Sequence, residues 1–270
     1  MASQRINGLT QRLIRRLIPW LLPVLLLAGW ELAADLGWLQ ARVLSAPSAV
    51  ALAFWQTLQD GSLLHNVGVS AGRALQGLAI GGLIGFALGV ANGVWRPAEL
   101  LLDSTLQMLR NVPHLAIIPL VILWFGIGES AKIFLVVLGV LFPVYINTYH
   151  GIRTIDPHLT EMARVYGLGP VARFWRVILP GALPSVFVGL RYGLGIMWLT
   201  LIVAETISAS SGIGYMTMNA REFLQTDVIL LGVIIYAVLG KLSDTLVKLL
   251  EQAALQWHPT YARPRREALA

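Results

Sequence analysis

The sequence predicts an all-α membrane protein that crosses the bilayer six times. Hydrophobic residues make up 56% of the 270 residues and charged residues only 13%, against about 25% charged in soluble domains. Mean hydropathy is +0.70. Because a span needs about 20 apolar residues to cross the hydrocarbon layer, the chain has room for five to seven spans and little else. It is predicted to be one membrane domain.

Hydropathy and helix-breaking residues place the six spans along the chain. They are expected at about 17–36, 67–94, 98–125, 129–149, 184–207 and 228–249. A basic segment, 1–16, precedes the first span, which has no A-x-A-like cleavage site and is therefore expected to be retained rather than removed as a signal peptide. The transmembrane domain then covers 17–252, and a C-terminal tail covers 253–270.

Two connections between spans carry local signals. Pro47 is expected to begin a short amphipathic helix that runs to about Leu58 and precedes the second span. After the fifth span, residues 205–227 are expected to form a tight outer loop in which Gly212 and Gly214 are turn residues. This loop either helps to close an outer gate or is a plain connection.

The second span carries five glycines at a fixed step of four residues. They are Gly77, Gly81, Gly85, Gly89 and Gly93. Small residues at this spacing form one ridge on a helix and let two backbones approach closely inside a membrane. The ridge is expected to pack against another helix of the same chain; a dimer contact or a sliding surface in gating is the alternative.

The third span places a charge near the middle of the bilayer. Arg110 lies about 20 Å along a helix that starts at Pro97, and Asn111, Pro113 and His114 follow it directly. An intramembrane charge marks a functional site by default, and proline frees backbone carbonyls that need a cavity or a helix beside them. These four residues are expected to line a translocation pathway; a structural ion pair at a packed kink is the alternative.

Two further charges lie inside expected spans. Arg73 is near the outer end of the second span, and Glu205 is near the outer end of the fifth. Because the two residues are at similar depth, they are predicted to form a buried, structural charge pair.

Lys and Arg are distributed unequally between the two sides of the membrane. With the N-terminus inside, thirteen of them lie in inner segments and three in outer segments. Positive residues concentrate in cytoplasmic loops, so both termini and the long polar segment between the fourth and fifth spans are predicted to be cytoplasmic. The net charge of +6 needs no nucleic-acid partner to explain it.

That polar segment has the signals of two short helices. One is expected to begin at Pro157 and to end at Gly167, and the second begins at Pro170. The second helix carries an aromatic pair, Phe174 and Trp175, flanked by arginines. Interface cores favour aromatic residues and Arg, so the segment is predicted to be a docking surface; a connector on the lipid surface is the alternative.

The polar segment, 151–183, also contains a motif, EMARVYGLGPVARFWRVILP. It resembles the cytoplasmic signature of ABC importer permeases: Glu-Ala-Ala, three residues, Gly, nine residues, Ile, one residue, Leu-Pro. The residues in register with it are Glu161, Ala163, Gly167, Leu179 and Pro180. Met162 replaces the second residue of the pattern, and Val177 replaces its Ile; both changes conserve apolar character.

The resemblance covers about residues 45–255. Stretches such as MLRNVPHLAIIPLVILWFGIGESAKIF and WLTLIVAETISASSGIGYMTMNAREFLQTD resemble the nitrate, sulfonate and taurine branch of these permeases, and aliphatic sulfonate permeases most of all. It implies a type I importer permease fold in a bacterial inner membrane, working by alternating access. It also implies a permease homodimer, two cytoplasmic ATPase subunits that grip the polar segment, and a periplasmic or lipid-anchored binding protein. Taurine and nitrate remain alternative substrates.

Catalysis by this chain is not predicted. The sequence has no G-x-x-x-x-G-K-[ST] loop, so ATP is expected to be used by a partner subunit and no cofactor by this chain. There are no cysteines, and the five histidines have no metal-ligand spacing. An intramembrane serine protease needs a Ser–His pair at one depth, which the expected spans do not provide. A secondary transporter, the closer rival, would not need the motif at 161–180.

Overall fold

A computed structural model describes residues 18, 21–40 and 42–258, and this part of the chain contains helices and no strand. The expected basic segment, 1–16, and most of the expected tail, 259–270, lie outside the described residues. The chain divides into two compact units. The first comprises the described residues up to 64 together with 216–234, and the second comprises 65–215 together with the described residues from 235 onward.

The first unit is built on a helix over 21–35 and on α2 (Pro47–Gln59). Pro47 occupies the first turn of α2, as the sequence predicts, because its missing N–H has no partner to lose there. The carboxylate of Glu31 accepts hydrogen bonds from the backbone N–H and the hydroxyl of Ser48. The start of α2 is thereby fastened to the preceding helix.

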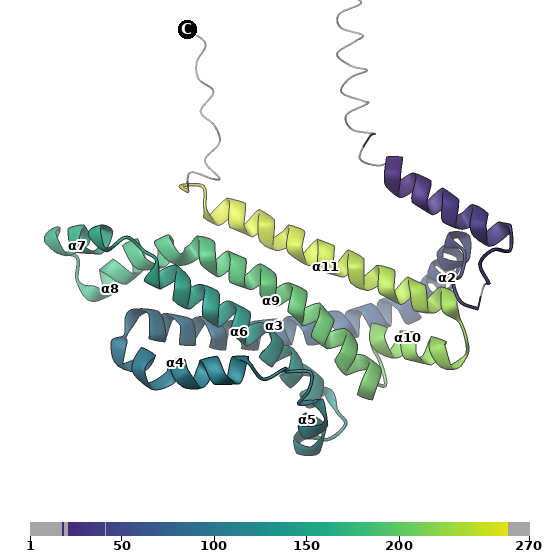
Figure 1. Cartoon of the computed structure of the whole chain (residues 1–270), viewed down its shortest axis with the longest axis horizontal. Helices are drawn as coiled ribbons and strands as arrows, with labels where there is room; N and C mark the ends of the chain where they lie inside the picture. The colour runs from purple at the N-terminus through teal and green to yellow at the C-terminus, as the bar shows by residue number, and fades with distance from the viewer. Residues whose placement is uncertain (1–17, 19–20, 41, 259–270) are drawn as a thin grey trace, which may run out of the picture. The chain divides into compact units, whose positions relative to one another are not determined.

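The second unit contains a close pair of long helices, α3 (Ser62–Val94), whose first residues belong to the first unit, and α6 (Glu129–Arg153) (Figure 1). The glycine ridge of α3 faces α6. A Cβ atom added at Gly81 would lie 2.6 Å from the carbonyl oxygen of Val137, and one at Gly89 would lie 2.6 Å from the Cβ of Thr148. The ridge thus packs against a helix of the same chain, so closely that the two backbones are in contact.

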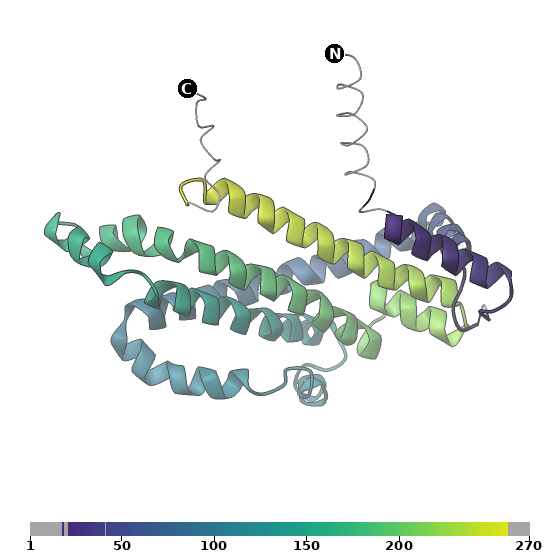
Figure 2. The ribbon, with the colours of Figure 1, turned by 45° about the horizontal axis from the view of Figure 1, so that its top comes forward.

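The third expected span, 98–125, is not one kinked helix. It is divided into an amphipathic α4 (Arg96–Arg110) and a short apolar α5 (Ile118–Phe125), with seven non-helical residues between them. Pro113 lacks the N–H that would continue α4, and Pro119 lies in the first turn of α5. Figure 2 shows the break, with α5 viewed end-on beside the length of α4.

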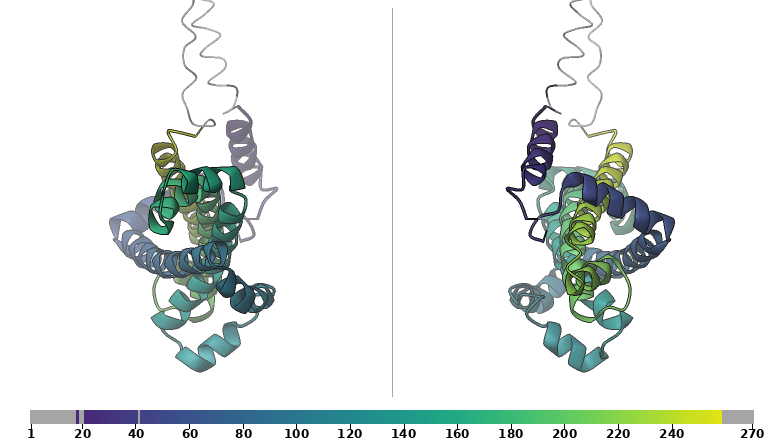
Figure 3. Two further views of the ribbon diagram at one scale, coloured as in Figure 1. Left: turned by 90° about the vertical axis from the view of Figure 1, so that its left-hand side faces the viewer. Right: turned by 90° about the vertical axis from the view of Figure 1, so that its right-hand side faces the viewer.

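A small apolar core holds α5 in place. Ile118 and Val121 of α5 pack with Ala131 and Leu135 of α6 and with Ala204 of α9 (Leu179–Ser208). In views nearly along the long helices of this unit, α5 lies across them at the bottom of the picture (Figure 3). The break therefore redirects the chain without leaving α5 unsupported.

The polar segment runs into the fifth expected span without the predicted break between them. After α7 (Pro157–Val165), a helix begins at Pro170 with α8 (Pro170–Arg173), passes through one π-helical turn, η1 (Phe174–Ile178), and continues as α9. The span expected to begin at Pro184 therefore begins earlier, and Pro184 lies inside a helix. The irregular part of the segment 151–183 is confined to 154–156 and 166–169.

The outer loop expected at 205–227 is also different. It contains α10 (Ile213–Glu222), which leads into α11 (Thr226–Ala254). Gly212 has a φ of +109° directly before α10 and is a turn residue, as expected. The expectation for Gly214 is wrong, because Gly214 lies in the first turn of α10.

Four helices among the described residues are long and apolar enough to cross a membrane. They are Ser62–Val94, Glu129–Arg153, Pro170–Ile207 and Thr226–Ala254. They correspond to the second, fourth, fifth and sixth expected spans. The first expected span lies partly outside the described residues, and the third is broken.

Candidate functional site

The polar connection between α6 and α9 forms a small helical knob, which we define as 154–178. Asp156 caps α7 by accepting a hydrogen bond from the backbone N–H of His158. At the other end, Leu168 N–H bonds the carbonyl of Ala163, and Gly167 N–H bonds that of Arg164. With Gly167 at a φ of +75°, this is a Schellman motif. It turns the chain sharply, so α8 begins close to the end of α7.

The residues of the signature motif differ in their exposure to solvent. Glu161 is largely exposed, with its carboxylate 3.9 Å from the Nδ1 of His158, whereas Ala163 is buried beneath it. Phe174 and Trp175 contact each other edge to face with ring centroids 5.4 Å apart, and Trp175 is exposed.

Other apolar side chains of the knob, Met162, Val165, Tyr166 and Val171, are exposed too. Leu179 and Pro180 are half-buried at the start of α9. An exposed apolar surface with aromatic residues on a polar connection can bind a protein partner.

A cavity of about 250 Å³ opens at the break between α4 and α5. Arg110 and His114 line it, and its walls are apolar side chains of α6 and α9, with Gly139 at one point. The ring of His114 is fixed by a 3.0 Å hydrogen bond between its Nε2 and the Oγ1 of Thr200. The expected pathway group is therefore only partly assembled here, because Asn111 and Pro113 are exposed and are not among the lining residues.

The cavity is amphipathic. Arg110 is exposed and makes no ion pair with another described residue, so its guanidinium is available to an anion. Opposite it, Leu138, Phe142 and Ile196 present hydrocarbon. A small organic anion with an alkyl chain matches both surfaces.

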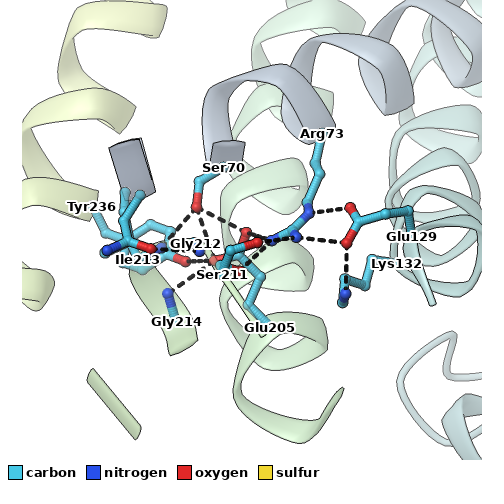
Figure 4. Close-up of polar contacts among 11 residues, drawn as sticks. Ser70, Arg73, Glu129, Lys132, Glu205, Ser211, Gly212, Ile213, Gly214 and Tyr236 are labelled. Carbon is cyan, nitrogen blue, oxygen red and sulfur yellow. Dashed lines mark hydrogen bonds and ion pairs between the residues drawn. The ribbon is translucent and has the colours of Figure 1, made fainter. Parts of the chain in front are cut away.

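Arg73 and Glu205 meet in a buried charge cluster (Figure 4). The Nη1 of Arg73 lies 2.7 Å from the Oε1 of Glu205, and both side chains are almost completely buried. The other edge of the guanidinium binds Glu129 through Nε and Nη2, and Lys132 binds the same carboxylate at 2.9 Å. Two cations and two anions balance in this cluster. Arg73, Lys132 and Glu205 are buried, whereas the Glu129 side chain is 55% exposed.

Glu205 accepts further hydrogen bonds on both oxygens. The donors are the hydroxyls of Ser70 and Tyr236 and the backbone N–H of Gly214, at 2.8–2.9 Å. Arg73 also donates to the carbonyl of Ser211 at 2.7 Å. The cluster thereby connects α3, α6, α9 and α11 to residues 211–214. Because the Glu205 side chain is completely buried, a substrate cannot reach it.

Sequence reasoning missed several residues of these sites. Glu129 is the first residue of α6. It therefore lies at the same expected depth as Arg73 and Glu205, and this shared depth is a signal from which it can be predicted. Thr200 and Tyr236 carry no such signal, because a hydroxyl in an apolar helix is common and only the packing of α9 and α11 shows what it contacts.

The comparisons with known proteins agree with this architecture. A family model described as the inner membrane component of a binding-protein-dependent transport system matches residues 81–256. A protein of Escherichia coli (strain K12) named for aliphatic sulfonates transport, the permease SsuC, is 59% identical over 246 residues, covering 91% of this chain and 94% of its own. The SsuC of Bacillus subtilis (strain 168) is 46% identical over 89% of this chain and 87% of its own.

More distant relatives and solved structures are similar to the chain as well. The taurine transport permease TauC of Escherichia coli (strain K12) is 35% identical over 86% of each chain. Among solved structures, a chain of the MetNI methionine ABC transporter, in an inward-facing conformation, superposes with a TM-score of 0.62 at 19% identity, covering 73% of this chain and 97% of that one. The expected all-α importer-permease fold is therefore confirmed.

The matched region, 81–256, includes both the knob and the cavity. The relatives are permease components rather than enzymes. The chain belongs to the family of inner membrane components of binding-protein-dependent transport systems, and it is the permease of an ABC importer.

Proposed function

We propose that this permease carries aliphatic sulfonates across a bacterial inner membrane by alternating access. In this proposal two copies of the chain form the pathway, both termini are cytoplasmic, and lipid surrounds the assembly. Two cytoplasmic ATPase subunits bind the knobs, and a periplasmic or lipid-anchored binding protein delivers the substrate.

The cavity at the break between α4 and α5 carries the proposal. A sulfonate group is a compact anion that keeps its charge at neutral pH, and the Arg110 guanidinium offers it several donors in one plane. The alkyl chain would lie against the hydrocarbon of α6 and α9. His114 adds a polar contact whose orientation is set by Thr200.

The same lining disfavours the alternative substrates. Taurine carries an ammonium group as well as a sulfonate, and no carboxylate is among the residues that line the cavity. Nitrate has no apolar part to use the walls. The relatives point the same way, because identity to the two proteins named for aliphatic sulfonates exceeds identity to the taurine permease.

The knob supports coupling to ATP. Glu161 and the exposed aromatic Trp175 belong to a rigid unit that joins α6 to α9, so movement of a bound ATPase would act on both helices at once. Closure of the ATPases on ATP would then switch the paired permeases between inward-facing and outward-facing states. A secondary transporter would have no use for this surface.

Uptake into proteoliposomes tests the proposal. Labelled alkanesulfonate uptake would be measured with the ATPase and the binding protein present or absent, for wild type and for Glu161→Lys. Asp35→Lys is the matched control, because it makes the same charge change at an exposed carboxylate far along the chain from the knob.

We expect uptake to require ATP and both partners, to be lost in Glu161→Lys and to be retained in Asp35→Lys. Uptake without ATP would identify a secondary transporter instead. ATP hydrolysis coupled to another substrate, with no sulfonate uptake, would retain the importer and overturn the substrate.

A further inference from the structure

A second hollow lies where the knob meets the ends of α3 and α6. Its volume is about 340 Å³. Its apolar lining residues include Val94, Ile152 and Ile178. Three arginines line it, each from a different element: Arg153 at the end of α6, Arg164 in the last turn of α7 and Arg173 at the end of α8. The proposed transport mechanism assigns no ligand to this hollow, although Arg164 and Arg173 belong to the knob.

Two of the three arginines have no side-chain partner among the described residues. Arg164 and Arg173 make no ion pair and no side-chain hydrogen bond in that part of the chain. Arg153 has only a 3.7 Å approach to Glu99, whose carboxylate also accepts a 2.8 Å hydrogen bond from Tyr149. Because like charges repel, three guanidiniums around one hollow favour the arrival of an anion.

The Schellman motif at Gly167 assembles the hollow. It reverses the chain between α7 and α8, which brings Arg164 and Arg173 to the same space although they belong to separate helices. The arrangement is therefore set by the backbone and does not depend on a partner being bound.

We infer that this hollow binds a phosphate group, and that its source is the headgroup of an anionic phospholipid. The inference rests on the proposed orientation, in which the knob is cytoplasmic. The hollow is then at the inner ends of two spans, at the depth of the headgroups. Basic pockets beside transmembrane helices on the cytoplasmic side suit anionic headgroups, and arginine matches phosphate oxygens with paired donors.

The apolar residues of the lining favour a lipid over a free ion. Val94, Ile152 and Ile178 give hydrocarbon contact directly beside the three cations, which fits a headgroup joined to its glycerol and the first methylenes of the chains. Free phosphate would be surrounded by water and would make no use of these apolar side chains.

Lipid binding to the full-length permease in detergent tests the inference. Native mass spectrometry would measure bound phosphatidylglycerol, with phosphatidylcholine and inorganic phosphate as competing probes. The test variant is Arg164→Gln with Arg173→Gln. The matched control is Lys241→Gln with Lys248→Gln, which removes the same number of positive charges from exposed positions of α11.

We expect the arginine variant to bind phosphatidylglycerol about 30-fold more weakly, on the order of what two interfacial cations contribute. The lysine control should bind as wild type does, and Arg164→Lys with Arg173→Lys should lie between. Phosphatidylcholine should compete poorly, as should inorganic phosphate.

Three results would overturn the inference. Unchanged lipid binding in the arginine variant would remove the site, and an equal loss in the lysine control would make the attraction unspecific. Effective competition by inorganic phosphate would make the ligand a free anion rather than a lipid. ATPase capture by the same variants, measured in parallel, separates this inference from the docking role: lost capture with intact lipid binding would assign the arginines to the ATPase.

Discussion

The Nη1 of Arg73 lies 2.7 Å from the Oε1 of Glu205, although 132 residues separate them in the chain. The pair is buried, and every other polar atom around the carboxylate donates to it: two hydroxyls and one backbone N–H. An ion pair in such surroundings is costly to break because either partner alone would be a buried, uncompensated charge.

Glu205→Gln is therefore expected to lower the free energy of unfolding by about 3–5 kcal/mol. Tyr236→Phe removes one donor and keeps the pair, so it should cost less, about 1.5–3 kcal/mol. Unfolding in mixed micelles measures both. Tyr215→Phe, at a more exposed hydroxyl outside the cluster, is the control and should have almost no effect. Equal stability of Glu205→Gln and wild type would show that the cluster contributes nothing.

The glycine ridge predicts that two glycines of α3 differ in how much an alanine there destabilises the protein. Gly89→Ala would place its Cβ 2.6 Å from that of Thr148, whereas Gly82 has nothing within 4 Å of the same position. Gly89→Ala should destabilise by about 1–3 kcal/mol through overpacking. Gly82→Ala should be neutral or stabilise by up to about 1 kcal/mol, as alanine favours helix. Thermal unfolding in detergent distinguishes the two, and similar shifts for both variants would argue against close packing on α6.

Gly167→Ala tests the turn of the knob. Gly167 has a φ of +75°, which costs an alanine about 1–2 kcal/mol. Gly169, two residues later, has a φ of −62° and open space around it, so Gly169→Ala is the matched control. We expect Gly167→Ala to reduce capture of the ATPase severalfold and Gly169→Ala to leave it unchanged. Full capture by both variants would mean that the turn geometry does not serve docking.

Gly139→Ala should narrow the cavity at the break. The added methyl group would lie 2.9 Å from the Oγ1 of Thr200 and 3.0 Å from Ile196. One methyl in a binding pocket changes discrimination by about 10-fold or more, so uptake of long alkanesulfonates should fall more than that of methanesulfonate. Gly195→Ala, where nothing lies within 4 Å, is the control. A uniform loss over all chain lengths would indicate a folding defect instead.

Arg110→Gln should reduce kcat/KM for sulfonate uptake by about 10-fold or more, because hydrogen bonds to a charged partner contribute about 1.5–3 kcal/mol. Arg110→Lys keeps the charge and loses the planar donor set, so it should retain part of the activity. The measurement is initial uptake at several sulfonate concentrations. If Arg110→Gln transports as wild type does, with ATP hydrolysis still coupled, Arg110 does not contact the substrate.

The elements that the sequence predicts well are those whose signals are local. Pro47 begins α2, Pro157 begins α7 and Gly167 ends it, because helix starts and left-handed turns depend on a few adjacent residues. The closeness of Arg73 and Glu205 was also accessible, since depth in a bilayer can be counted along a helix.

The remaining differences arise where the local signal fits more than one structure. In the expected span 98–125, Pro113 and Pro119 fit a kinked helix as well as a broken one, and the packing of α5 on α6 and α9 holds the broken form. The helix that starts at Pro170 continues into α9 because one π-helical turn, η1, joins the two without a break. Similarly, the sequence indicates a loop where α10 lies, because Gly212, Gly214 and the polar residues around them resemble turn residues.

The packing of α3 on α6 has a mechanical consequence. α6 is 25 residues long, about 36 Å, and its glycine contacts with α3 allow little independent bending. One end of α6 leads into the knob, and the other begins with Glu129, which binds Arg73. We therefore expect α3 and α6 to move together, so a tilt imposed at the knob would carry Glu129 and its partner Arg73 with it at the far end of the pair.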